Sequence, residues 1–113
     1  MKLIFNDLPK ISNNKFYAGI HWSKRKELKD NLASLVRVLF FKQTNRRSFS
    51  KPCKVEYIFE FKQKPLDCSN CVGMLKIIED VLFPDDSVKI VKKLKITSLK
   101  SVENKVTVII DEL

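Results

Sequence analysis

The stretch that decides the fold is Lys54-Val55-Glu56-Tyr57-Ile58-Phe59-Glu60-Phe61-Lys62. Its valine, tyrosine and two phenylalanines fall on every second position, and most of the positions between them are charged. Such alternation is typical of a β-strand that buries one face and exposes the other. Lys64-Pro65 then ends the strand, because proline cannot donate to a sheet ladder.

Helical and strand patterns flank this strand on both sides. Apolar residues at helical spacing predict helices over 23–43, with Ser23 as the N-cap, and over 70–82, which Pro84 ends. Further strands are expected over 2–8, 88–97 and 105–111, the last two as an antiparallel hairpin. The order β-α-β-α-β-β predicts an α/β (α+β) fold: a mixed, roughly four-stranded sheet with two helices packed on it.

The composition is that of one globular domain spanning residues 1–113. Hydrophobic residues make up 44% and charged residues 31%, which is too apolar for a disordered chain. No apolar run approaches the length of a membrane span, and the apolar start of the chain is too short for a signal peptide. We therefore expect a soluble, cytoplasmic protein with no membrane partner.

The net charge of +9 is the first indication of a partner. A positive field of this size favours a polyanion, most simply nucleic acid, read through its backbone or shape. The loop around Arg46, Arg47, Phe49 and Lys51 is basic and carries one aromatic. Either it contacts phosphates while Phe49 stacks on an open base, or it is a solvated loop with Phe49 folded inward.

Three cysteines are an odd number, which argues against a disulfide framework. Cys68 and Cys71 form a CxxC pair, and a zinc site would need both remaining candidates, Cys53 and His21. Small apolar filler around a turn is the simpler interpretation. The sequence contains no glycine-rich phosphate loop, so no nucleotide cofactor is expected.

Acidic residues are scarce, so their placement matters. Asp67 follows the central strand, Asp80 lies in the second helix, and Asp85-Asp86 follow Pro84. Such carboxylates hold a hard cation such as Mg²⁺, or they serve as helix caps and turns. Lys76 lies four residues before Asp80, which fits a surface ion pair or a cation beside a scissile phosphate.

Four short motifs, in order, resemble those of the RusA-type Holliday junction resolvases, crossover junction endodeoxyribonucleases. Ser12-Asn13-Asn14-Lys15-Phe16-Tyr17 looks like the SNN-[RK]-[YF]-Y segment, and Leu66-Asp67-Cys68-Ser69-Asn70 is similar to the D-x-D-N motif. The segment 74–82 resembles the helix in which a Lys precedes an Asp by four. Asp85-Asp86-Ser87-Val88 resembles the DD-x-[QV] turn, and 21–26 looks like phage-encoded members.

The resemblance implies a homodimer that binds four-way DNA junctions and hydrolyses a phosphodiester with Mg²⁺, or with Mn²⁺ instead, in recombination and repair. Asp67, Lys76 and Asp86 would be catalytic, with Asp67, Asp85 and Asp86 as metal ligands. Asn70 and Asp80 would be auxiliary. The expected DNA-contacting residues are Lys15, Lys24, Arg25, Arg46, Arg47, Phe49 and Lys51.

One departure from the pattern keeps an alternative open. Ser69 stands where the second aspartate of D-x-D belongs, and a hydroxyl binds Mg²⁺ more weakly than a carboxylate. The chain could instead be a catalytically weakened or inactive DNA-binding protein on the same fold. A basic protein that binds RNA or another protein is a third hypothesis.

Overall fold

The fold is known from a computed structural model, which describes residues 1–12, 21–46, 48–83 and 87–113. The elements are β1 (Lys2–Asn6), α2 (Trp22–Thr44), β2 (Cys53–Phe61), the 3₁₀ turn η1 (Cys68–Cys71), α3 (Val72–Leu82), the short α4 (Ser87–Ile90), β3 (Val91–Lys100) and β4 (Lys105–Glu112). The order of strands and main helices is the predicted one.

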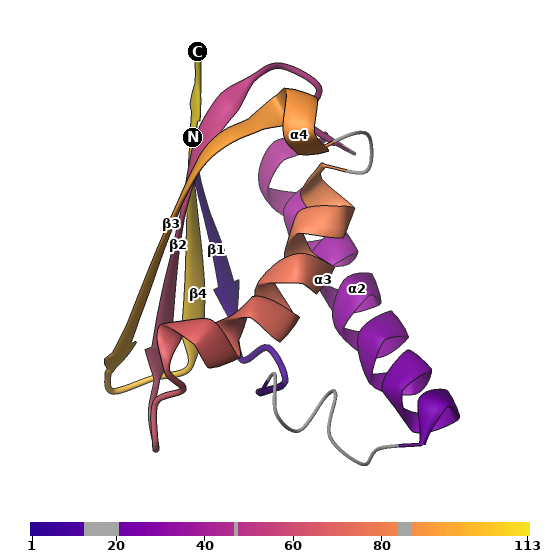
Figure 1. Ribbon diagram of the computed structural model, residues 1–113, viewed down its shortest axis with the longest axis vertical. Coiled ribbons are helices and arrows are strands. Elements are labelled where there is room, and N and C mark those ends of the chain that lie inside the picture. The colour runs from indigo at the N-terminus through magenta and orange to yellow at the C-terminus, as the bar shows by residue number, and fades with distance from the viewer. Residues whose placement is uncertain (13–20, 47, 84–86) are drawn as a thin grey trace.

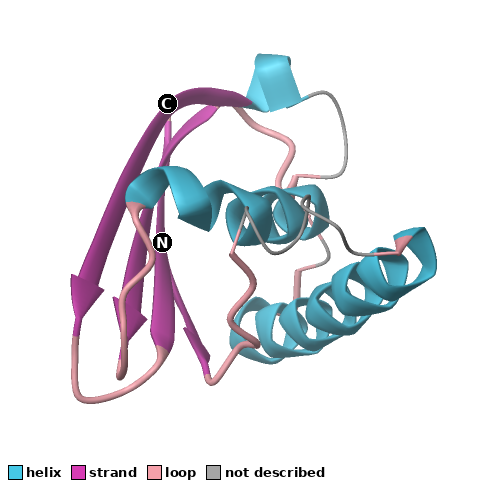
Figure 2. Ribbon diagram, turned by 60° about the horizontal axis from the view of Figure 1, so that its bottom comes forward, coloured by secondary structure: helices cyan, strands magenta, loops and turns pink. Residues whose placement is uncertain are grey.

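The four strands form one mixed sheet in the order β1-β4-β2-β3. β4 runs antiparallel to both neighbours, and β3 runs parallel to β2. Figure 1 shows the sheet as one layer and the helices α2 and α3 as a second layer beside it; Figure 2 shows the same two layers from another side. In the described part of the chain, no helix covers the opposite face of the sheet.

The decisive stretch forms the inner strand β2 as predicted. Its residues alternate between buried and more exposed along all of Cys53–Phe61. Tyr57 and Phe59 are fully buried and pack in one core with Leu32 of α2 and Ile78 of α3. The predicted apolar stripe of α3 is buried as well: Met74, Leu75, Ile78, Val81 and Leu82.

The predicted hairpin of the last two strands is wrong. β2 lies between β3 and β4, so the two strands that follow one another in sequence are not neighbours in the sheet. The loop 101–104 instead crosses the carboxyl end of β2. Ser101 N donates to Phe61 O at 2.9 Å, and Asn104 Oδ1 accepts a 2.9 Å hydrogen bond from Lys62 N.

Two boundaries differ from the sequence expectations. His21, not Ser23, is the N-cap of α2: its imidazole Nδ1 accepts a hydrogen bond from Ser23 N at 3.2 Å. The strand expected to begin at 88 begins at Val91, because Ser87–Ile90 form a helical turn. Leu94, expected inside, is 44% exposed, because β3 is the edge strand.

Candidate functional site

The DxxN segment lies directly after β2, where η1 leads into α3. Asp67 is the N-cap of η1, and its backbone carbonyl accepts hydrogen bonds from Asn70 N at 2.9 Å and Cys71 N at 3.1 Å. Its side chain makes no capping hydrogen bond and is exposed. The Asp67 carboxylate is therefore available to a ligand, and side-chain capping of η1 does not explain it.

A hollow opens in front of this carboxylate. We call it the Asp67 hollow; it is lined by residues 64–67 together with Lys10, Ser12 and Asn70. Ser12 belongs to the first motif of the resemblance, and Asp67 and Asn70 to the second. Segments more than fifty residues apart in the sequence thus meet at one place on the surface.

Two lysines, which the sequence analysis did not single out, make the Asp67 hollow basic. The Lys10 ammonium donates to the carbonyl of Lys64 and lies 5.4 Å from the centre of the Phe61 ring. These contacts fix Lys10 beside Asp67. Lys64 could have been predicted from the sequence as a site residue, because it lies just before Pro65 and Asp67.

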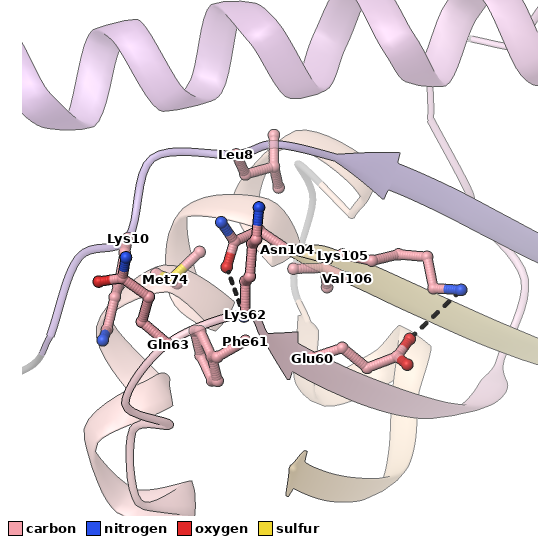
Figure 3. Close-up of a pocket in the computed structure, with 10 residues that line it drawn as sticks. All are labelled: Leu8, Lys10, Glu60, Phe61, Lys62, Gln63, Met74, Asn104, Lys105 and Val106. Carbon is pink, nitrogen blue, oxygen red and sulfur yellow. Dashed lines mark hydrogen bonds and ion pairs between the residues drawn. The ribbon is translucent and has the colours of Figure 1, made fainter. Parts of the chain in front are cut away.

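A second hollow adjoins the first and is shown in Figure 3. This Asn104 hollow is lined by residues 60–63 and 104–106, with Leu8, Lys10 and Met74. One of its three lysines is paired with an acid: Lys105 Nζ lies 3.4 Å from Glu60 Oε2, and that carboxylate raises the pKa of Lys105. Because Lys10 lines both hollows, the two form one basic rim at the carboxyl end of β2.

Lys76 and Asp80 do not line the Asp67 hollow. Both are exposed on α3, and the Lys76 ammonium lies 3.7 Å from Glu79 Oε1. Of the two alternatives for Lys76, the surface ion pair describes the structure, but its partner is Glu79 and not Asp80. Glu79 is 7% exposed, and burial raises the pKa of its carboxyl.

Asp85 and Asp86, like Lys15 and Arg47, lie outside the described residues. The described residues before and after the acidic pair are Phe83, beyond the C-terminus of α3, and Ser87, at the start of α4. Asp67 precedes the opposite end of α3, which at 11 residues is about 16 Å long. The site that can be built from described residues therefore contains Asp67 and Asn70.

These two residues suit a hard cation. Mg²⁺ prefers oxygen ligands, keeps several waters and is commonly held by one or two carboxylates with substrate phosphates. The Asp67 carboxylate and the Asn70 amide oxygen are ligands of this kind. Within residues 1–12, 21–46, 48–83 and 87–113, no three His, Cys, Asp or Glu side chains gather closely enough to hold a metal by themselves.

The two cysteines of the CxxC pair differ in exposure, because Cys68 faces solvent and Cys71 does not. Cys71 is buried, and desolvation raises the pKa of its thiol to about 11. Its Sγ lies 3.9 Å from Leu66 O, and Cys68 Sγ lies 3.7 Å from Ile96 O. The interpretation as small apolar filler around a turn thus describes the buried Cys71 and not the exposed Cys68.

The expected stacking residue Phe49 is in the core, so the stacking interpretation is wrong. Its ring is 3% exposed and lies 5.4 Å from the ring of Phe40 and 5.7 Å from that of Phe83. The structure agrees with the other alternative, in which Phe49 is folded inward. Arg46 covers it from outside, 5.3 Å above the ring, with a guanidinium nitrogen 3.3 Å from Glu112 Oε1.

The other expected DNA contacts lie along α2 and the loop after it. Lys24 and Lys51 are exposed, Arg25 is half-buried, and Lys24 Nζ lies 4.0 Å from Glu27 Oε2. They are spread over the helix layer and do not gather in the Asp67 hollow.

No protein-family model matches the chain, and no curated protein matches it. In the described ranges, no helix is both long enough and apolar enough to cross a membrane.

Proposed function

We propose that the chain is a structure-selective endodeoxyribonuclease that hydrolyses a phosphodiester at four-way DNA junctions with Mg²⁺, or Mn²⁺ in its place. The observation that carries the proposal is the Asp67 hollow. Residues from two motifs of the resemblance, Ser12 on one side and Asp67 with Asn70 on the other, line it beside two lysines. An exposed carboxylate inside a basic rim suits a cation that must also meet a phosphate.

In this proposal each side chain has a limited task. Asp67 and Asn70 would hold the cation, and a bound cation would supply polarisation of the phosphate and a water of lowered pKa. Lys10 and Lys64 attract the DNA backbone and offset its charge near the scissile bond. Lys76 is held by Glu79 outside the hollow, so its catalytic role remains a prediction, as do the metal-binding roles of Asp85 and Asp86.

The test is cleavage of a synthetic four-way junction with Mg²⁺ by wild type and by Asp67→Asn. We expect the variant to lose cleavage at least a hundredfold and to keep junction affinity within about threefold, because only the charge that holds the cation is removed. Asp111→Asn, the same change at an exposed residue of β4, is the matched control and should cut like wild type. Cleavage by Asp67→Asn at the wild-type rate would exclude this site.

A DNA-binding protein without nuclease activity is the second candidate. One observation favours it: Ser69 stands where the motif that it resembles has a carboxylate. It predicts that wild type binds the junction in preference to duplex at equal salt and leaves it uncut with Mg²⁺ and with Mn²⁺. Equal affinity for junction and duplex would contradict both candidates.

Two further parts belong to the same proposal. A homodimer would present two sites to the two-fold arrangement of a junction, and sedimentation at equilibrium tests this state. Such a nuclease would meet DNA in the cytoplasm. For a phage-encoded chain, this would be the cytoplasm of the bacterial host.

A further inference from the structure

The outward face of α2 carries an apolar surface that the core does not use. Phe41 is 46% exposed and Val38 is 52% exposed, and together with Arg37, Lys42 and Arg46 they line one hollow on the helix. We call these five residues the Phe41 patch. The next residue toward the N-terminus, Phe40, is fully buried, so a rotation of about 100° per residue turns Phe41 toward solvent.

The charges around this patch have one sign. Arg37 lies four residues before Phe41, one turn away on the same side of the helix, and Lys42 follows directly. No described residue forms an ion pair with Arg37 or Lys42, and no acid lines the hollow. Arg46 is held in place by Glu112 and by the ring of Phe49.

An exposed aromatic ring among cations is complementary to an unpaired nucleobase and its flanking phosphates. Base faces stack on aromatic side chains with little regard to sequence, and neighbouring cations follow the phosphate chain. A second copy of the chain is a poorer occupant, because it would bring Arg37 and Lys42, which pair with no described acid, against the same two cations in a protein of net charge +9.

We propose that the Phe41 patch binds single-stranded DNA, with an unpaired base stacked on Phe41 and phosphates against Arg37 and Lys42. This inference rests on the proposed function, since the strands at a junction centre are where a base can leave its partner. The proposal assigns base stacking to Phe41, whereas the sequence had suggested Phe49. In a fully paired duplex the base faces are covered by their neighbours, so Phe41 has no partner there.

The experiment measures by anisotropy, at one salt concentration, the affinity of wild type and variants for three fluorescent DNAs: a 20-nucleotide oligo(dT), a 20-base-pair duplex and the four-way junction. We expect Phe41→Ala to weaken binding of oligo(dT) about tenfold or more and to leave duplex affinity within twofold. Phe41→Leu keeps an apolar side chain and loses the ring, so it should weaken oligo(dT) nearly as much. Val102→Ala, at an exposed apolar residue of the loop 101–104, is the control and should match wild type.

Any of five results would overturn the inference. Wild-type affinity of Phe41→Ala for oligo(dT), or full rescue by Phe41→Leu, would exclude stacking. Equal weakening on duplex and oligo(dT) would make Phe41 a general contact. Junction binding by wild type without binding of oligo(dT) would sink this inference alone, whereas failure to bind any of the three DNAs would sink the proposed function as well.

Discussion

Glu79 places an acid inside the helix layer, beside the buried phenol of Tyr57. Burial raises the pKa of the Glu79 carboxyl above its ordinary value near 4.5; the Lys76 ammonium opposes this rise and Asp80 adds to it. Burial, with a further contribution from Glu79, also raises the pKa of Tyr57. The hydroxyl of Tyr57 has no hydrogen-bond partner among the described residues. Glu79 and Tyr57 therefore place polar groups in the core at a cost in stability.

The first prediction follows from this shift. Because the folded-state pKa of Glu79 lies above the unfolded value, the native state holds the proton more tightly, and stability falls as pH rises from about 4.5 through the folded pKa. Glu79→Gln stays neutral throughout. We therefore expect the free energy of unfolding of Glu79→Gln, minus that of wild type, to grow between about pH 4 and about pH 7.

Urea unfolding of both proteins across this range measures the difference. Asp30→Gln, a change of an exposed acid on α2, serves as control, and its difference from wild type should vary little with pH. A Glu79→Gln difference that shrinks with rising pH would contradict the burial argument.

Substitutions of Phe49 and Phe41 should differ in their effect on stability, because Phe49 belongs to the core and Phe41 to the proposed binding surface. Phe49 is enclosed by two other rings, so Phe49→Ala should lower the free energy of unfolding by about 3–5 kcal/mol, the usual cost of deleting a buried aromatic. Phe41→Ala should change it by less than about 1 kcal/mol, because nearly half of that ring already faces water. Thermal or urea denaturation of the two variants tests this, and a larger loss for Phe41→Ala would place that ring in the core.

At the scale of elements, the sequence predicts what depends on local pattern. The alternation in β2 and the stripe of α3 translate directly into burial. The pairing of β3 and β4 does not follow from local pattern, because it depends on the crossover β2-α3-β3, which places β3 beside β2 in parallel. The lysines of β3 were a signal for an edge strand, since charged side chains protect exposed sheet edges.

The candidate site was predictable to a similar extent. The spacing of Asp67 and Asn70 after a strand end was readable, and Ser12 entered through the resemblance. The role of Lys10 could not be predicted, because its position depends on a contact with the carbonyl of Lys64, fifty-four residues away. Phe49 was misread because a basic loop in the sequence does not reveal which of its side chains turns inward.

The loop 101–104 provides a prediction at this scale. Asn104 Oδ1 caps the backbone N–H of Lys62 at the end of β2, while Asn104 O accepts a 3.0 Å hydrogen bond from Asp7 N. Asn104→Ala should cost about 0.5–1.5 kcal/mol of stability, because the Lys62 N–H exchanges its protein acceptor for water. Asn104→Asp retains an oxygen there and should recover most of the loss in urea unfolding. Equal losses for both variants would show that the side-chain oxygen is not what matters.

At the scale of the whole molecule, the two faces differ in how their charges are paired. On the open face of the sheet, lysines stand opposite glutamates: Lys95 Nζ lies 3.7 Å from Glu56 Oε2, and Lys105 has Glu60 at 3.4 Å. On the helix layer, Arg37 and Lys42 of the Phe41 patch have no acid in their hollow and no ion pair with a described residue, whereas Arg46 is paired with Glu112. If the chain binds DNA as proposed, the field toward the phosphates should therefore be stronger on the helix side, despite the lysines of β3.

This asymmetry predicts how junction affinity responds to salt. Each phosphate contact by a lysine contributes about 0.9 to the slope of log affinity against log salt for duplex DNA, and about 0.7 for single strands. Lys42→Gln should lower the magnitude of the slope by about 0.7–0.9. Lys95→Gln should leave it unchanged within about 0.2, because Lys95 is already paired with Glu56. Titrations of a four-way junction over a range of KCl concentrations measure both slopes. If Lys95→Gln lowered the slope and Lys42→Gln did not, the DNA would cross the open face of the sheet, and α2 would not be the binding surface.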